Sequence, residues 1–92
     1  MGAGTLAAVG LIAEFTVEPF VEGDPGPHVR AALDAARDSG LPVEFGPFGT
    51  AVSGPAEDVI KVIAAVVRVA TEHGATTISI QVRTDGSPPA DQ

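Results

Sequence analysis

The sequence of 92 residues contains no cysteine, tryptophan or tyrosine, and only four phenylalanines. Without cysteine the chain can form no disulfide, no thiolate zinc site, no iron–sulfur cluster and no cysteine nucleophile. Its hydrophobic core must therefore be built from aliphatic residues, alanine and the few phenylalanines. A chain of this length has room for a single core, so we expect one domain.

Basic residues are also scarce, with five Lys and Arg against twelve Asp and Glu and a formal net charge of −7. Negative charge repels phosphate backbones and anionic bilayers, so nucleic acids and membrane surfaces are not expected as partners. The longest apolar run, Val62–Val67, is far shorter than the ~20 residues that cross a bilayer. Residues 1–10 lack the positive charge that begins a secretory signal. We therefore expect a soluble, cytoplasmic protein with a flexible extension at residues 1–10.

Four segments have the pattern of β-strands. Residues 11–18 and 76–83 alternate apolar and polar side chains, which is typical of a strand with one buried face. Residues 41–45 and 50–53 are also predicted strands, joined by the turn sequence Gly46-Pro47-Phe48-Gly49. The exposed face of the first and last strands is expected to carry polar side chains, namely Glu14, Thr16, Glu18, Ser79, Gln81 and Arg83.

Apolar residues at helical spacing predict two helices, one over about residues 27–39 and one that ends at His73. We expect Asp24 and Pro25 to start the first helix, and Gly40 and Gly74 to stop the two helices. The second helix begins after a Ser-Gly-Pro sequence and has acidic residues in its first turn, where the helix dipole favours them. Residues 85–92 are predicted to form a disordered tail.

The second helix has an unusually broad apolar arc. Large apolar surfaces are rarely exposed to solvent, so another part of the protein is expected to pack against this arc. We favour a neighbouring subunit over a long loop of the same chain. The expected core stripe comprises Val59, Ile63, Val66, Val67 and Ala70, and it is widened by Ile60, Val62 and Val69.

The predicted order is strand, helix, strand, strand, helix, strand. This order is typical of the α+β ferredoxin-like βαββαβ fold, in which two helices cover one face of a four-stranded antiparallel sheet. The domain is expected to span residues 11–84. Its uncovered sheet face, polar without being densely charged, suits a wet interface or a ligand surface.

No catalytic or metal-binding constellation is evident. There is no phosphate-binding Gly-Lys-Ser/Thr sequence. Neither His28 nor His73 has a second potential metal ligand three or four residues further on, which favours a surface role for both. His73 is expected to interact with the negative end of its helix. Glu14 and Glu18 share a strand face but are about 13 Å apart at ~3.3 Å per residue, too far to act on one bond.

The turn between the two central strands is the candidate binding feature. Two glycines and a proline stiffen it and leave its amides and the Thr50 hydroxyl available to a small heterocycle. Phe48 or Phe45 could stack on such a ring, and Glu14 or Glu44 could accept a hydrogen bond from an exocyclic amine. An ordinary hairpin turn with Phe in the core is an equally good interpretation.

Four features of the sequence occur together in a fixed order. They are Ile12-Ala13-Glu14-Phe15 in the first strand, Gly40-Leu41 after the first helix, the hairpin sequence from Glu44 to Thr50, and the helix from Ile60 to Gly74 with the Thr- and Ile-rich strand after it. In these features the sequence resembles the YkoF-like thiamine-binding proteins, small ferredoxin-like domains of bacteria and archaea. The resemblance covers roughly residues 11–85.

The resemblance implies a bacterial-type, non-enzymatic domain that binds thiamine or its hydroxymethylpyrimidine moiety and forms a tetramer of paired dimers. It assigns ligand binding to the matching positions Glu14, Thr16, Phe48, Gly49 and Thr50, and the reading of the turn adds Glu44. No cofactor and no metal are implied, because the thiamine compound is the ligand.

Two functional hypotheses follow. The leading one is a homo-oligomeric, cytoplasmic carrier or sensor of thiamine or a pyrimidine precursor. The positive charge on the thiazolium ring of thiamine suits the acidic chain. The alternative is a structural interaction module that assembles through sheet edges or faces and binds no metabolite. An enzymatic role comes third, because no residue is placed to activate a nucleophile.

Overall fold

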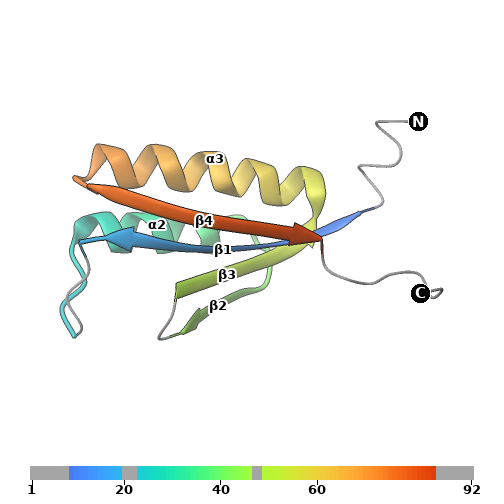
Figure 1. Cartoon of the computed structure of the whole chain (residues 1–92), viewed down its shortest axis with the longest axis horizontal. Helices are drawn as coiled ribbons and strands as arrows, with labels where there is room; N and C mark the ends of the chain where they lie inside the picture. Colours follow the sequence, from blue (N-terminus) through green and yellow to red (C-terminus); the bar gives the residue numbers. More distant parts are fainter. Residues whose placement is uncertain (1–8, 20–22, 47–48, 85–92) are drawn as a thin grey trace.

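The computed structural model describes residues 9–19, 23–46 and 49–84. The elements follow one another as predicted (Figure 1). They are β1 (Gly10–Glu18), α2 (Pro27–Asp38), β2 (Val43–Gly46), β3 (Gly49–Pro55), α3 (Ala56–Glu72) and β4 (Thr77–Thr84).

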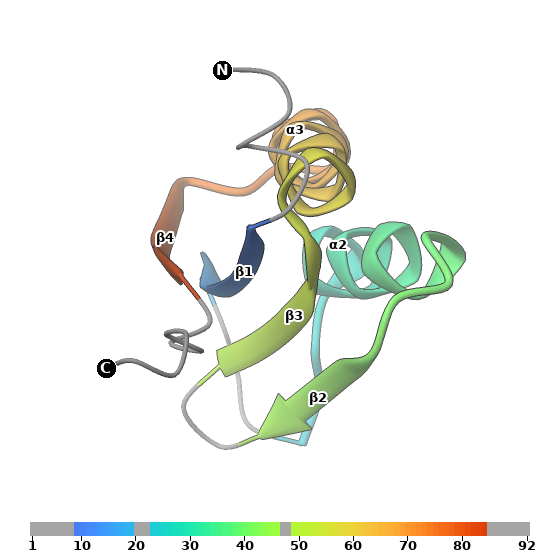
Figure 2. The ribbon, with the colours of Figure 1, turned by 90° about the vertical axis from the view of Figure 1, so that its right-hand side faces the viewer.

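The four strands form one antiparallel sheet in the order β2-β3-β1-β4. Both helices lie on the same side of this sheet, and no described helix or strand covers the other side (Figure 2). The ferredoxin-like α+β fold is therefore confirmed. The strand pattern explains it, since β1 buries Ala13, Phe15 and Val17 toward the helices while the residues between them stay exposed. The expected polar residues of β1 and β4 are all exposed.

The core lies between the helices and the sheet. Its side chains are small, and Val52, Val59 and Val66 are the largest that are fully buried. In α3 the expected stripe is partly wrong, because Val62 is buried whereas Val67 is 39% exposed. The buried stripe of α3 consists of residues 59, 62, 66 and 70, which are spaced three or four apart. Val67 lies outside this stripe and therefore faces outward.

The helix ends follow local chemistry. Gly40 and Gly74, the predicted stops, have φ angles of +80° and +100°, which favour glycine. Helix α2 begins at Pro27, as the predicted range of about 27–39 has it, but its N-cap is Gly26 and not the expected Asp24 with Pro25. Pro27 fits there because its fixed φ suits a first helical position and that position needs no N–H donor.

The ends of the chain fall largely outside the described residues. Residues 1–8 and 85–92 hold most of the predicted extension and tail, while Gly10 already belongs to β1. The Val9 carbonyl also accepts a 2.9 Å hydrogen bond from the Ala56 N–H. Within the described ranges, neither helix combines the length and apolar character needed to cross a bilayer.

Candidate ligand-binding site

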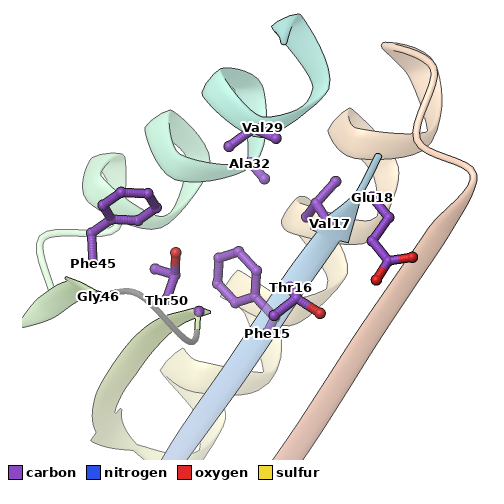
Figure 3. A pocket seen from close by; sticks show the side chains of 10 residues that line it. Phe15, Thr16, Val17, Glu18, Val29, Ala32, Phe45, Gly46 and Thr50 are labelled. Atoms are coloured by element: carbon purple, nitrogen blue, oxygen red, sulfur yellow. The ribbon is translucent and has the colours of Figure 1, made fainter. Parts of the chain in front are cut away.

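A cavity of about 190 Å³ lies beside the C-terminal part of β1, at the β2–β3 hairpin. Among the described residues, pairing between β1 and β3 extends to Phe15 opposite Thr50, whereas pairing between β1 and β4 continues to Glu18. Part of α2 covers the cavity (Figure 3). The lining consists of Phe15, Thr16, Val17 and Glu18 of β1, Val29 and Ala32 of α2, Phe45 and Gly46 of β2, and Gly49 and Thr50 of β3.

Two phenylalanine rings flank a threonine hydroxyl in this cavity. The sheet register places Phe45 opposite Thr50 and Thr50 opposite Phe15, so all three side chains share the helix side of the sheet. Their side chains can be followed in Figure 3, where Thr50 lies between the two rings. Phe15 and Thr50 are buried, but Phe45 is 50% exposed. The cavity thus has one fixed ring, one accessible ring and a hydroxyl between them.

Gly49 allows β3 to approach β1 at the edge of the cavity. Its φ of +140° is one that residues with a side chain rarely adopt. A Cβ atom at this position would lie 2.8 Å from the Phe15 carbonyl oxygen and 3.1 Å from Thr16 Cγ2. The close approach therefore depends on glycine.

A second hollow, of about 370 Å³, lies beside the same hairpin and includes side chains of the uncovered face. Glu44, Ala51 and Glu14 form one row across β2, β3 and β1. Glu14 also makes an exposed ion pair with Arg83, at 3.4 Å between Oε1 and Nη1. The hollow shares Phe45, Gly46, Gly49 and Thr50 with the cavity. The carboxylates of Glu14 and Glu44 therefore stand beside the cavity, whose own lining includes the carboxylate of Glu18.

The expected site residues divide between these two spaces. Thr16, Gly49 and Thr50 line the cavity, and Glu14 and Glu44 line the hollow. Phe48 lies outside the described residues. Phe45, the alternative stacking ring, lines both spaces. The sequence interpretation did not assign Phe15, Val17, Glu18, Val29 or Ala32 to the site.

Most of these missed residues look like core residues in the sequence. Phe15 and Val17 follow the inward phase of the β1 alternation, and Val29 and Ala32 follow the apolar stripe of α2. Such residues face a cavity only when neighbouring elements fail to meet above them. The ends of helices and strands, which decide where neighbouring elements meet, are the least certain part of a sequence-based prediction.

His28 does not have the surface role expected for it. It is buried, with 8% of its surface exposed. Its Nε2 is in contact with the Pro19 carbonyl oxygen, so Nε2 carries the proton and donates. Gly26 makes room for the ring, because a Cβ there would lie 2.7 Å from His28 Cε1. His28 therefore holds the end of β1 to the start of α2, beside the cavity.

His73 lies at the C-cap of α3, where its Nδ1 is 2.7 Å from the Val69 carbonyl oxygen. This is the interaction with the negative helix end that the sequence predicts. In the ranges the structure describes, no group of three His, Asp or Glu residues is placed to hold a metal ion.

The sequence pattern of one family, described as thiamine-binding protein, matches residues 13–92. The chain belongs to this family. The match includes every described residue that lines the cavity. Among curated proteins, none matches the chain significantly.

Solved structures with the same fold come from several organisms. A domain of unknown function from Bacillus cereus has a TM-score of 0.67 and 20% identity, with 90% of this chain and 82% of that chain covered. A candidate thiamine biosynthesis/salvage protein from Thermotoga maritima has a TM-score of 0.52 and 22% identity, covering 83% and 82% of the two chains. A protein from Streptococcus pneumoniae has a TM-score of 0.53 and 20% identity, with 84% of each chain covered. At these identities the likeness establishes the fold.

Proposed function

We propose that this protein binds thiamine or its hydroxymethylpyrimidine moiety in the cavity between β1, the β2–β3 hairpin and α2. The observation that carries the proposal is the pair of phenylalanine rings on either side of Thr50. Aromatic faces bind a flat heterocycle by offset stacking or edge contacts, and a hydroxyl both donates and accepts hydrogen bonds. Membership of the thiamine-binding protein family supports this ligand class.

The size of the cavity fits one ring of the ligand. Its volume of about 190 Å³ is below the ~300 Å³ at which pockets for drug-sized ligands begin. A two-ring compound such as thiamine therefore extends beyond the cavity. The neighbouring hollow with Glu14 and Glu44 offers a negatively charged place for its cationic ring.

The proposed role is carrier or sensor, not catalyst. The only ionisable side chain among the lining residues described is that of Glu18. A nucleophile needs a base beside it, and general acid–base work needs a second group in reach of the same atom. We place the protein in the cytoplasm as a homo-oligomer, in line with its acidic surface and the apolar residues exposed on α3.

Isothermal titration with thiamine and with hydroxymethylpyrimidine tests this proposal. Both compounds are expected to release or absorb heat with one site per chain. A Phe45→Ala variant serves as the probe of the cavity, because Phe45 is half exposed and its loss costs binding more than folding. The absence of heat from the native chain at millimolar ligand, with the fold intact by circular dichroism, contradicts the proposal.

The alternative is a structural assembly module that binds no metabolite. The observation in its favour is the pair of large apolar side chains exposed on α3, Ile60 at 47% and Val67 at 39%. The two functions respond differently to Thr50→Val. Weaker ligand binding with an unchanged oligomer supports the binding protein, whereas a dissociated oligomer in a chain that binds no ligand supports the assembly module.

A further inference from the structure

Positive charge is distributed unequally over the protein. Of its five Lys and Arg residues, Arg30 and Arg37 belong to α2, Lys61 and Arg68 belong to α3, and Arg83 alone belongs to a strand. Both helices lie on one side of the sheet (Figure 2). Arg83 is therefore the one Lys or Arg side chain that the strands can present away from the helices.

Arg83 pairs with Glu14 on the uncovered face. Arg83 stands opposite Ile12 and Glu14 stands opposite Gln81, so Arg83 and Glu14 are diagonal neighbours across β1 and β4. Arg83 Nη1 lies 3.4 Å from Glu14 Oε1, and the two side chains are 54% and 47% exposed. Ion pairs at this exposure are weak, because water and salt screen them. Another cation can therefore replace Arg83 beside Glu14.

Glu14 also lines the hollow beside the β2–β3 hairpin. Glu44 lines it too, and between the two carboxylates lies Ala51, whose single methyl group fills little space. The residues described for this lining include no Lys, Arg or His. The hollow of about 370 Å³ therefore offers a cation two carboxylates, one of which already has Arg83 as its counter-ion.

We propose that Arg83 competes with the cationic thiazolium of the ligand for Glu14, and that it thereby limits the preference of the protein for thiamine over hydroxymethylpyrimidine. The proposal rests on the function proposed above, with the thiazolium in the hollow. Like charges repel, so a thiazolium that approaches Glu14 displaces the guanidinium. The lost ion pair lowers the affinity for thiamine alone, because hydroxymethylpyrimidine lacks the charged ring. Arg83 thus acts through Glu14 and need not touch the ligand.

Replacing Arg83 with Gln removes the competing charge and keeps a long polar side chain. At low salt we expect Arg83→Gln to bind thiamine about two- to five-fold more tightly, the value of one exposed ion pair, and to bind hydroxymethylpyrimidine as the native chain does. Arg83→Lys keeps the charge and is expected to bind both compounds like the native chain. Isothermal titration measures these affinities, and circular dichroism checks the fold.

Arg68→Gln is the matched control for net charge. Arg68 is exposed on α3, so its substitution makes the same change in charge on the helix side of the sheet. It is expected to leave both affinities unchanged. An equal increase of thiamine affinity in Arg68→Gln and Arg83→Gln overturns the inference, as does an Arg83→Gln variant that binds both compounds more tightly or neither.

A double-mutant cycle distinguishes competition for Glu14 from a general effect of charge. If Arg83 acts through Glu14, then Glu14→Gln removes its influence. The variants Glu14→Gln and Glu14→Gln/Arg83→Gln are therefore expected to bind thiamine equally. An Arg83→Gln effect of the same size with and without Glu14 contradicts the proposed competition.

A measurement on the native chain covers the case in which a variant does not fold. In the ¹⁵N-labelled protein, the Arg83 Nε–H resonance is expected to shift with thiamine and to stay unchanged with hydroxymethylpyrimidine. Equal shifts with both compounds, or no shift when thiamine is bound, overturn this inference and leave the proposed function standing. A native chain that binds hydroxymethylpyrimidine but not thiamine has the same consequence. A native chain that binds neither compound removes both proposals.

Discussion

Single residues fix the shape of the cavity, and Gly49 has the strictest requirement. It combines a positive φ with a backbone approach that leaves no space for a Cβ atom. Gly46, its partner across the hairpin, lacks both restrictions among the described residues, where a Cβ would meet the Gly49 carbonyl oxygen alone, at 3.9 Å. Two glycines that look alike in the sequence therefore have different tolerances.

We expect Gly49→Ala to lower the free energy of unfolding by about 2–4 kcal/mol, because it adds backbone strain and a contact with the Phe15 carbonyl. Gly46→Ala is the matched control and is expected to change stability by less than about 1 kcal/mol. Urea denaturation followed by circular dichroism measures both. Equal effects of the two substitutions would show that the close approach at Gly49 is unimportant.

Thr50 contributes a hydroxyl to a surface that is otherwise largely apolar. It is buried between the two phenylalanine rings and lines the cavity. Valine has nearly the same shape as threonine but no hydroxyl. The substitution therefore separates hydrogen bonding from packing.

Thr50→Val is expected to weaken binding of hydroxymethylpyrimidine by about three- to ten-fold, the usual value of one hydrogen bond. Thr71→Val, on the exposed surface of α3, is the control and should leave affinity unchanged. Calorimetric titration of both variants gives the comparison. Undiminished affinity in Thr50→Val would show that the Thr50 hydroxyl does not contribute to ligand binding.

At the scale of an element, α3 has an uneven distribution of charge. Its first turn carries Glu57 and Asp58, which complement the positive end of the helix dipole. Its last turn has no basic residue and contains Glu72, which opposes the dipole at the negative end. The first turn is thus favourable electrostatically, whereas Glu72 is unfavourable at the other end, next to the His73 contact with the Val69 carbonyl.

Reversing charge at the two ends of α3 should have opposite effects. The double substitution Glu57→Lys and Asp58→Lys is expected to destabilise the protein by about 1 kcal/mol at low salt, and Glu72→Lys to stabilise it by about 0.5 kcal/mol. Thermal unfolding at low and at high salt measures the effect, which should shrink as salt screens it. Effects of the same sign at both ends would exclude the dipole as their cause.

At the scale of the whole molecule, the outer side of α3 bears on assembly. Ile60 and Val67 lie two helical turns apart and are both exposed. We predict that a second copy of the chain covers them, as the breadth of the apolar arc and the family resemblance suggest. The number of subunits in the assembly stays a prediction.

Replacing both Ile60 and Val67 with Glu is expected to reduce the mass measured by light scattering to that of one chain, because burying two carboxylates in an interface is costly. Arg68→Glu adds acid to the same helix on its charged side and should leave the mass unchanged. Circular dichroism checks that each variant is folded. A native protein with the mass of a single chain contradicts the prediction.

The order of elements was predictable because local signals agree with one another. Alternation marks β1 and β4, and glycines at positive φ end both helices. The buried side of α3 was harder, since apolar residues surround most of that helix and do not say which of Val62 and Val67 faces inward. Only the packing of α3 against α2 and the sheet decides this.

The candidate site was predictable in part. Gly49 and Thr50 stand out because they belong to or adjoin a glycine-rich turn, whereas Thr16 came from the family resemblance. The structure places all three at the cavity. His28 was misjudged because an isolated histidine gives no sign that it is buried against the Pro19 carbonyl. The contributions of Phe15 and Val17 were hidden, because inward residues of a strand are taken as core.

The sequence by itself determined the strands, the helices and their order, since these depend on side-chain periodicity and on the φ preferences of glycine and proline, which act over a few residues. The tertiary structure alone decided that β1, α2 and the β2–β3 hairpin come together around a cavity. The cavity exists because these segments meet in space, and contacts between segments far apart in the chain leave no mark in either segment alone.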